Sequence, residues 1–293
     1  MIKTVETKNG SAIAIGNFDG FHLGHQKIGD TLKRLAGEQG LVSNIITFSP
    51  NPKIYFNREP YLITTDAQKK RILENQGVDR VSVIDFSSVV NMTDEQFLKE
   101  VLIDEYHMKH IVMGENFRFG KRREGDILFL KEASRRWDFQ FTVVSPVMLG
   151  DVRISSSLIR QQLAESNIES SNLMLGRPFF LEGVVVAGDH VGRQLGFPTI
   201  NLDTTNTLLP EGVFETKVEF GNQCLNSITY IGYRPTFDGK AKKVESHIFN
   251  FDREIYGEFV KINFLRQIRG EMKFDSKESL VYQIKKDIEK LKS

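Results

Sequence analysis

The chain has 293 residues, a single cysteine (Cys224), and 39 Lys and Arg against 38 Asp and Glu, which leaves a net charge of +1. This length predicts two domains, and the balanced charge gives no indication of binding to nucleic acid or to a membrane surface. One cysteine excludes an internal disulfide and a thiolate metal cluster. Without an apolar signal core or a bilayer-spanning run, we expect a cytoplasmic location, while the oligomeric state stays open.

Strand-like and helix-like segments alternate through the first half of the chain. They lie at 12–15, about 21–39, 42–48, 66–76, 80–85, 94–106, 110–113, 126–136 and 139–144. Such alternation forms βαβ crossovers, so residues 1–178 are predicted to be an α/β domain with a doubly wound, mostly parallel sheet. Ligands of such sheets bind beyond the carboxyl ends of the strands, where we expect the loops at 16–24, 48–52, 114–120 and 154–160.

Short strands and turns replace this alternation in the second half. Runs rich in Val, Ile and Phe at 179–186, 212–220, 225–232, 244–251 and 259–265 are separated by Gly, Asn, Asp and Pro. They predict a small antiparallel β-barrel domain over residues 179–293. A C-terminal amphipathic helix that packs on the barrel is predicted from the helical spacing of Val281, Ile284, Ile288 and Leu291.

The first motif begins where the first predicted strand ends. Gly16 and Gly20 permit a sharp bend, and a helix follows, so free backbone N–H groups and the positive end of the helix dipole face one space. His22 and His25 can donate hydrogen bonds to phosphate oxygens, and Gly24 lets a nucleotide approach closely. The spacing predicts a triphosphate site. The motif also resembles the nucleotidyltransferase signature, which implies that the α/β domain of residues 1–178 is nucleotidyltransferase-like. The alternative is a pair of solvent-facing histidines at a helix start.

The second motif is a glycine-rich stretch in the second half. Gly188, Gly192 and Gly196 are spaced four apart and precede a Pro-Thr-x-Asn sequence. Glycines let the backbone wrap phosphate oxygens, and the Thr199 hydroxyl and the Asn201 carbonyl are hard oxygen ligands suited to Mg²⁺. An ordinary β-hairpin loop with a Pro-Thr turn is the alternative.

A carboxylate also lies on an otherwise apolar strand of the second half. Glu245 shares a face with His247, because side chains two apart on a strand point the same way. A carboxylate in a phosphate site can accept the proton of an attacking hydroxyl and so act as a general base. A surface ion pair is the alternative.

Ordered motifs in both halves carry a family resemblance. They are Gly16-x-Phe18-Asp19-Gly20-x-His22-x-Gly24-His25, Thr47-Phe48-x-Pro50-x-Pro52, Gly114-x-Asn116-Phe117-Arg118-Phe119-Gly120, Ile154-Ser155-Ser156-Ser157-x-Ile159-Arg160, Gly192-Arg193-x-Leu195-Gly196-Phe197-Pro198-Thr199-x-Asn201, Pro210-x-Gly212-Val213, Ile231-Gly232-x-Arg234-Pro235-Thr236-Phe237 and Glu245-x-His247. From about residue 12 to the C-terminus, the chain resembles the prokaryotic bifunctional riboflavin kinase/FMN adenylyltransferases, commonly called FAD synthetases.

The resemblance implies two consecutive reactions that use ATP and Mg²⁺. In the second half, riboflavin would attack the γ-phosphate of ATP to give FMN, with Glu245 as the base and Thr199 and Asn201 holding Mg²⁺ and phosphate. In the first half, FMN would attack the α-phosphate of a second ATP to give FAD. There His22 and His25 would stabilise the leaving pyrophosphate.

The same match assigns the remaining site residues. Asn116 and Arg160 would hold the nucleotide and its phosphates, with Arg160 counted among the catalytic residues, and Ser156 would help to arrange the loop. Phe48 and Phe119 would stack or pack on the flavin, although a core role is the alternative for each. The other residues predicted to bind nucleotide are Gly16, Phe18, Asp19, Gly24, Gly188, Gly192 and Gly196.

Some positions depart from the family pattern. Asn51 stands where His is frequent, and Ser157 stands where Thr is usual. Phe214 and Glu215 replace a frequent Tyr-Ala pair, and Tyr230 replaces a common Asn. A monofunctional enzyme and a non-catalytic flavin-binding regulator are therefore alternatives. Because the candidate base and the candidate Mg²⁺ ligands are all retained, we expect the kinase to be active.

Overall fold

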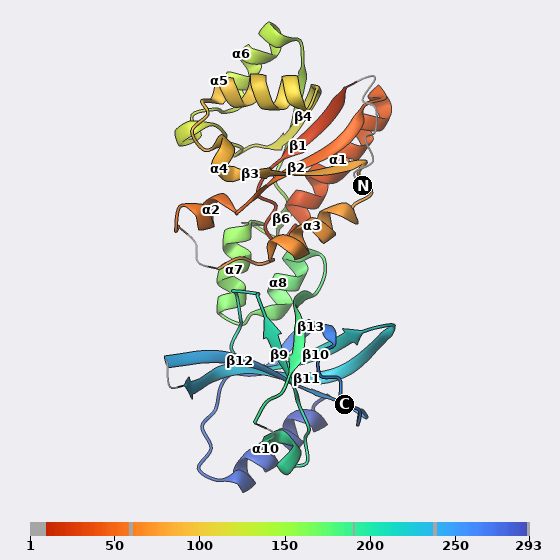
Figure 1. The fold of residues 1–293 in the computed structure, drawn as a ribbon, viewed down its shortest axis with the longest axis vertical. Coiled ribbons are helices and arrows are strands. Elements are labelled where there is room, and N and C mark those ends of the chain that lie inside the picture. Colours follow the sequence, from red (N-terminus) through yellow and green to blue (C-terminus); the bar gives the residue numbers. More distant parts are fainter. Residues whose placement is uncertain (1–9, 59–60, 190, 237–238, 292–293) are drawn as a thin grey trace. The chain divides into compact units, whose positions relative to one another are not determined.

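The computed structural model describes residues 10–58, 61–189, 191–236 and 239–291, which Figure 1 shows as a ribbon. The chain forms two compact units that divide between Ser156 and Ser157. The domain boundary after residue 178 stays a prediction, and Phe237 of the quoted motifs lies outside the described residues. Among the described helices, none has the length and apolar composition needed to cross a membrane.

A sheet of five parallel strands forms the centre of the first unit (Figure 1). In order across the sheet, the strands are β3 (Arg80–Asp85), β2 (Val42–Ser49), β1 (Ser11–Ile15), β4 (Met108–Gly114) and β5 (Gln140–Val144). Every neighbouring pair is parallel. This arrangement confirms the predicted α/β class.

Helices connect these strands at nearly the predicted positions. They are α1 (Leu23–Gln39), α2 (Pro52–Tyr55), α3 (Asp66–Glu74), α4 (Phe86–Val89), α5 (Asp94–Gln96), the π-helix η1 (Phe97–Glu105), the 3-10 helix η2 (Lys121–Arg123) and α6 (Ile127–Trp137), followed by the small pair β6 (Met148–Leu149) and β7 (Val152–Arg153). The helical segment predicted at 94–106 changes from α to π geometry after Gln96.

The two faces of β1 pack into different hydrophobic clusters, because side chains alternate along a strand. Ala12 and Ala14 join the cluster that contains residues of α1 and α3, whereas Ile13 and Ile15 join the cluster that contains residues of η1 and α6. A strand buried on both faces is typical of a doubly wound sheet. The strand order reverses between β1 and β4, so the loops that follow these two strands border the crevice in which such folds bind ligands.

The prediction of a loop over the whole of 154–160 is wrong, because a helix begins inside it. The helix α7 (Ser156–Ala164) starts at Ser156 and is followed by α8 (Ile168–Leu175). Serine is favoured at helix starts as well as in turns, so the Ser-Ser-Ser run does not distinguish the two. The buried Ile159 and Leu163, four residues apart, are the helical signal in this stretch.

A closed antiparallel barrel forms the second unit, as predicted. Around the barrel, the strands are β10 (Gly212–Phe220), β11 (Gln223–Thr236), β12 (Gly239–Ile248), β9 (Ile200–Thr204), β8 (Phe179–Val186) and β13 (Phe259–Arg269). The short helix α9 (Val191–Gln194) lies between β8 and β9. The strand β12 ends at Ile248 rather than at residue 251, and β9 continues the Pro-Thr corner as a strand.

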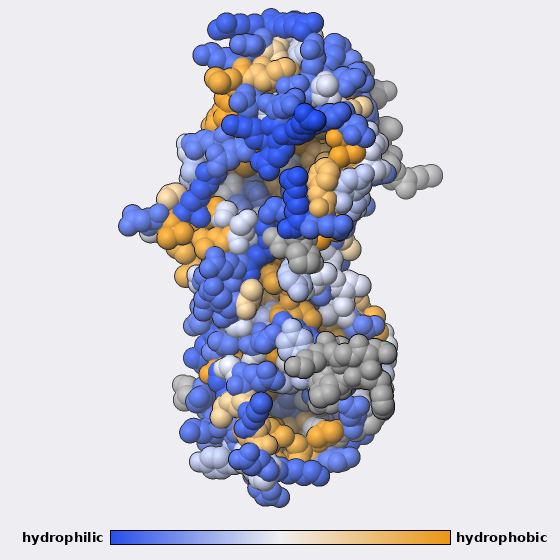
Figure 2. Space-filling model, turned by 90° about the vertical axis from the view of Figure 1, so that its left-hand side faces the viewer, coloured by the Kyte–Doolittle hydropathy of each residue, from blue (hydrophilic) through white to orange (hydrophobic). Residues whose placement is uncertain are grey.

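The predicted C-terminal helix is present as α10 (Lys277–Glu289), with Ser276 as its N-cap. An ion pair ties this helix to β13, because Arg269 Nε lies 2.7 Å from Asp287 Oδ2. Asp287 is 1% exposed and also accepts a hydrogen bond from Gln283. The surface in Figure 2 is largely hydrophilic, and its hydrophobic residues form small separate patches, as on ordinary folded proteins.

Candidate active sites

The loop after β1 places His22 at the N-cap of α1. Its Nδ1 accepts a hydrogen bond from the Gly24 backbone N–H at 3.2 Å. A Cβ on Gly24 would lie only 3.1 Å from the His22 ring, so glycine makes room for this ring. Because Nδ1 is an acceptor here, the proton of a neutral His22 lies on Nε2.

The two histidines of the motif stack on each other. Their ring centroids are 3.7 Å apart, and the Phe18 ring meets His25 edge-on at 5.2 Å. Burial lowers the pKa of His22 to about 4, and burial together with the nearby His22 lowers the pKa of His25 well below its usual value. Both rings are therefore neutral at pH 7. His25 Nδ1 is buried and has no hydrogen-bond partner among the described residues.

The rest of this loop is fixed by buried contacts. The Asp19 carboxylate accepts hydrogen bonds from the backbone N–H groups of Ile63 and Thr64 at 3.0 and 3.2 Å. The Asp19 carbonyl accepts one from the Ser156 hydroxyl at 2.9 Å, while the loop-arranging role of Ser156 stays a prediction. The Phe18 ring lies over Gly16, where a Cβ would be 3.3 Å from it. The histidines are thus held by a rigid loop.

A cation of the first unit was missed by the sequence reasoning. With the Asn116 amide oriented so that its oxygen faces Arg153, Oδ1 accepts hydrogen bonds from Nη1 at 2.6 Å and from Nη2 at 3.3 Å. The charge of Arg153 also contributes to the lowered pKa of His22, as a smaller cause than burial. The structure therefore brings the predicted Asn116 together with an arginine near the two histidines. The sequence feature that could have indicated a role for Arg153 is its position directly before the Ile-Ser-Ser-Ser run.

Arg160 belongs to the second compact unit rather than to the first. It is buried on α7, and its Nη2 donates a hydrogen bond to the Ser157 hydroxyl at 3.1 Å. Its predicted contact with nucleotide phosphates stays a prediction.

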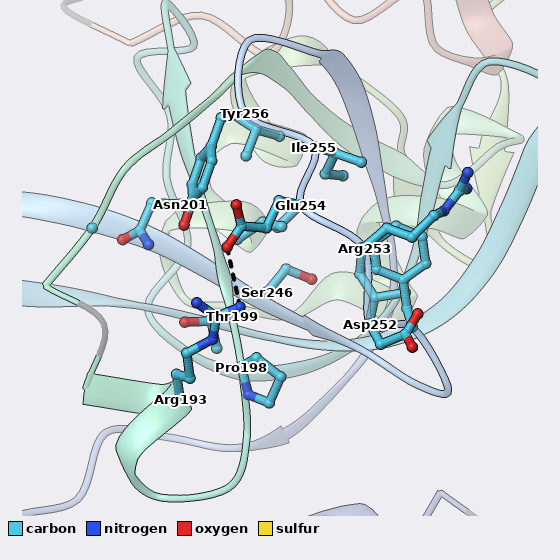
Figure 3. A pocket seen from close by; sticks show the side chains of 15 residues that line it. Arg193, Pro198, Thr199, Asn201, Ser246, Asp252, Arg253, Glu254, Ile255 and Tyr256 are labelled. Atoms are coloured by element: carbon cyan, nitrogen blue, oxygen red, sulfur yellow. Dashed lines mark hydrogen bonds and ion pairs between the residues drawn. The ribbon is translucent and has the colours of Figure 1, made fainter.

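A pocket of about 290 Å³ opens on the barrel beside the second motif. Thr199 and Asn201 line it, and Glu254 and Tyr256 from the segment before β13 face them (Figure 3). Across its opening, Arg193 Nη2 lies 3.1 Å from Glu254 Oε1. The predicted Mg²⁺ ligands therefore share one cavity.

Glycines bring the loop between β8 and β9 close to these ligands. A Cβ on Gly188 would lie 2.1 Å from Asn201 Nδ2, and a Cβ on Gly192 would lie 2.4 Å from the Phe197 carbonyl oxygen. Gly196 has a φ of 86°, in the left-handed region that favours glycine. We call the described residues 188, 189 and 191–196 the flap. Gly188 can lie against Asn201 only because it has no side chain.

Glu245 lies on β12 directly opposite Asn201 of β9. Directly opposite residues of an antiparallel pair share a face and have neighbouring side chains. Glu245 is partly exposed, whereas the next residue, Ser246, is buried on the interior face of the barrel. His247, on the same face as Glu245, contacts the Pro198 carbonyl oxygen through Nδ1 at 2.8 Å and fixes the corner before Thr199. The candidate base and the candidate Mg²⁺ ligands are therefore adjacent.

Comparison with known proteins identifies both units. A family model described as FAD synthetase matches residues 4–158, and one described as riboflavin kinase matches residues 175–293. The chain is 36% identical to the bifunctional riboflavin kinase/FMN adenylyltransferase of Bacillus subtilis, over 98% of this chain and 92% of that protein. The chain belongs to this bifunctional family. It is likewise an enzyme with riboflavin kinase and FMN adenylyltransferase activity, as predicted.

Further relatives of the family agree with this membership. The enzyme of Buchnera aphidicola from Schizaphis graminum is 36% identical over 96% of this chain and 93% of that protein. A solved structure from Streptococcus pneumoniae, described as a macrolide-efflux protein, has a TM-score of 0.87 and 33% identity, with 98% of this chain and 95% of that chain covered. The two compact units described above are therefore an architecture that this chain shares with a solved structure.

The predicted flavin contacts of the adenylyltransferase differ in their surroundings. Phe119 is 7% exposed and packs within a hydrophobic cluster, as in its alternative core role. Phe48 packs edge-on against Phe86 at 5.7 Å, and Phe86 also meets the half-exposed Tyr55 and Phe56. The sequence reasoning missed this aromatic face of Phe48, Tyr55, Phe56 and Phe86. The sequence feature that could have indicated this face is the aromatic pair Tyr55-Phe56, which follows shortly after Pro52.

Most of the residues that depart from the family pattern have structural partners. Asn51 is 3% exposed, and its side chain accepts a hydrogen bond from the Lys53 N–H at the start of α2. Phe214 is fully buried and packs on Phe264 with ring centroids 5.3 Å apart. Glu215 pairs with Arg266 on the barrel exterior. These three residues serve the fold.

Tyr230 is the departure that lies beside the candidate base. It is directly opposite Glu245 on the neighbouring strand. Its hydroxyl occupies the space over Gly232 and donates a hydrogen bond to Glu271 at 3.1 Å. The replacement of Asn by Tyr therefore changes the immediate surroundings of Glu245.

Proposed function

We propose that the barrel phosphorylates riboflavin with Glu245 as the general base, and that the α/β unit adenylylates FMN with the histidine pair as hydrogen-bond donors. One observation carries the kinase assignment: Glu245 lies directly opposite Asn201, which itself lines the pocket. A base, a phosphate-binding flap and hard oxygen ligands are the groups that phosphoryl transfer from ATP to an alcohol requires.

In the kinase reaction, the 5′-hydroxyl oxygen of riboflavin forms a bond to the γ-phosphorus of ATP. Its proton moves to the Glu245 carboxylate, and the bond from the γ-phosphorus to the bridging oxygen breaks, so ADP leaves with the electron pair. The fold supplies positioning and neutralisation of charge, which are the main needs of this transfer. Glu245 is partly exposed, so water can carry the accepted proton away.

The donors at this site fit Mg²⁺. Thr199 offers a hydroxyl and Asn201 a carbonyl oxygen, and the bare backbone at Gly188 leaves room for the Asn201 amide. Mg²⁺ prefers oxygen ligands and fills its remaining positions with water and substrate phosphates. When bound, the ion would neutralise charge on the phosphates of ATP.

In the adenylyl transfer, a phosphate oxygen of FMN forms a bond to the α-phosphorus of ATP. The bond from this phosphorus to the bridging oxygen breaks, and pyrophosphate leaves with the electron pair. His22 can donate from Nε2, because its Nδ1 is engaged with Gly24. Neutral donors fixed in a rigid loop stabilise developing charge without reorganising. Arg153 would add a positive charge beside Asn116.

The flavin of FMN would lie on the aromatic face of Phe48, Tyr55, Phe56 and Phe86. Half-exposed rings offer a surface on which a tricyclic ring can stack. We further propose a cytoplasmic enzyme whose partners are ATP, riboflavin, FMN and FAD, without nucleic acid or membrane. The net charge of +1 supports this last point.

Incubation of the purified protein with riboflavin, ATP and Mg²⁺, followed by chromatographic separation of flavins, tests the proposal. We expect FMN to form first and FAD to follow. Accumulation of FMN without FAD would identify a kinase alone, and FAD formed only from added FMN would identify an adenylyltransferase alone. Absence of both products would indicate a flavin-binding regulator.

A further inference from the structure

Lys243 is a cation of the kinase site that no motif assigns. It lies on β12 two residues before Glu245, so the two side chains share the outer face of the barrel. Its side chain is 33% exposed. A lysine in this position can reach the space in front of the candidate base.

The ammonium group of Lys243 is held by the flap. Its Nζ donates a hydrogen bond to Asp189 Oδ2 at 3.0 Å. Asp189 directly follows Gly188, whose backbone lies against the Asn201 amide. The cation is thus placed where the flap, the strand of the candidate base and a candidate Mg²⁺ ligand meet.

Two neighbouring cations are engaged elsewhere. Lys242 pairs with Glu211 at 2.9 Å and donates to the Leu209 carbonyl oxygen. Arg193 pairs with Glu254 across the pocket opening. Lys243 differs from both because it contacts the carboxylate of Asp189, the residue that follows Gly188 beside Asn201.

We propose that Lys243 is a catalytic residue of the kinase, which exchanges Asp189 for the γ-phosphoryl group when ATP binds. This inference rests on the kinase function proposed above. As the flavin 5′-oxygen bonds to the γ-phosphorus and the bridging bond to ADP breaks, the ammonium group donates hydrogen bonds to non-bridging oxygens of the transferring group. The proton of the hydroxyl still moves to Glu245, and Lys243 stays protonated throughout.

The chemistry of lysine suits this exchange. An ammonium group on a flexible stem can follow a moving phosphate as a point charge. A partly exposed ion pair is weak, so replacing the Asp189 carboxylate by a polyphosphate requires little free energy. Asp189 then keeps the cation in place until the nucleotide arrives.

Steady-state kinetics of four variants test this role. Lys243→Gln removes the charge at similar length and is expected to lower kcat for FMN formation about 100-fold, as for loss of one transition-state donor. Lys243→Arg keeps the charge and should recover most of this loss. Asp189→Asn releases the lysine and should lower the KM for ATP. Lys261→Gln is the matched control, because Lys261 is 32% exposed and pairs with Glu219 on another part of the barrel; it should behave as the unchanged enzyme.

Adenylylation of added FMN by the same samples reports that each variant is folded. Wild-type rates for Lys243→Gln would overturn the proposal, as would equal losses in Lys243→Gln and Asp189→Asn, because the lysine would then only tie down the flap. Failure of the unchanged enzyme to phosphorylate riboflavin would instead overturn the kinase function itself. These outcomes are distinct.

Discussion

The two candidate sites of this chain are built by opposite means. The histidine pair of the α/β unit is stacked, neutral and packed against Phe18 in a loop fixed by buried hydrogen bonds. The kinase groups of the barrel lie on an outer face, and their flap is held by exposed ion pairs through Asp189 and Arg193. We therefore expect the first site to be formed before its substrates arrive and the second site to be completed when its substrates bind.

This difference follows from what each reaction needs. Adenylyl transfer to a phosphate requires no general base, so fixed neutral donors suffice. Phosphorylation of a hydroxyl requires a base that exchanges its proton with water, and a flap that closes on ATP and opens again for ADP. The glycines of the flap and the partial exposure of Glu245 fit the second need.

The largest expected effect is on the kinase base. Glu245→Gln keeps the shape of the side chain and removes the proton acceptor, so FMN formation should fall about 1,000-fold. FAD formation from added FMN should persist, because the base belongs to the barrel alone. Glu219→Gln, a carboxylate on another barrel strand that pairs with Lys261, is the control and should keep both rates. Equal loss of both activities in Glu245→Gln would contradict the division of labour.

The next effect separates donor chemistry from packing in the histidine pair. His25→Phe keeps an aromatic ring beside Phe18 and removes both ring nitrogens, so we expect FAD formation from FMN to fall about 100-fold. Riboflavin phosphorylation should continue in the same sample. His110→Phe provides the matched control, because His110 is also buried but bonds to Thr142 on β5. His110→Phe should lower the free energy of unfolding and leave the rate of adenylylation unchanged. If His25→Phe also left this rate unchanged, the His25 ring would have a packing role only.

A pH-dependent loss of stability should mark the buried histidines. The folded-state pKa of His22, about 4, lies below its unfolded value of 6.5, so the unfolded chain binds the proton first. The contribution of neutral His22 to the free energy of unfolding is therefore fully present above pH 6.5 and is lost as the pH falls toward 4. Between pH 7 and pH 5, the free energy of unfolding should fall by about 2 kcal/mol. Urea denaturation followed by the fluorescence of Trp137, the one Trp of the chain, measures this in the first unit. His22→Asn keeps an N-cap and should lack this part of the pH dependence; an unchanged slope would remove His22 as its source.

Much of the fold could be predicted from the sequence, because the patterns that define it are local. The strand predicted at 80–85 and the strands at 179–186 and 212–220 have the observed bounds. The helix α7 was missed because its serines indicate a turn as readily as a helix start. The π geometry of η1 could not be predicted, since it depends on packing and not on residue type.

The sites were predicted as sets of residues but not as contacts. The histidine and Pro-Thr-x-Asn motifs place their polar groups close together in the sequence, so their spacing alone predicts them as candidate sites. Arg153 and Lys243 carry no motif, and their partners Asn116 and Asp189 are 37 and 54 residues away in the sequence. Such pairs depend on how loops meet after folding.

The smallest effect concerns the ion pair across the kinase pocket. Arg193 and Glu254 are 62% and 59% exposed, so water and salt screen their attraction. Glu254→Gln should change the free energy of unfolding by less than about 1 kcal/mol and leave the rate of FMN formation within about threefold, measured by calorimetry and by the flavin assay. If the flap closes on ATP and opens again for ADP, a weak ion pair suits it, because a strong pair would hold the flap in one position. A large loss of FMN formation in Glu254→Gln would mean that the pocket opening is as rigid as the histidine loop, and the contrast between the two sites would not hold.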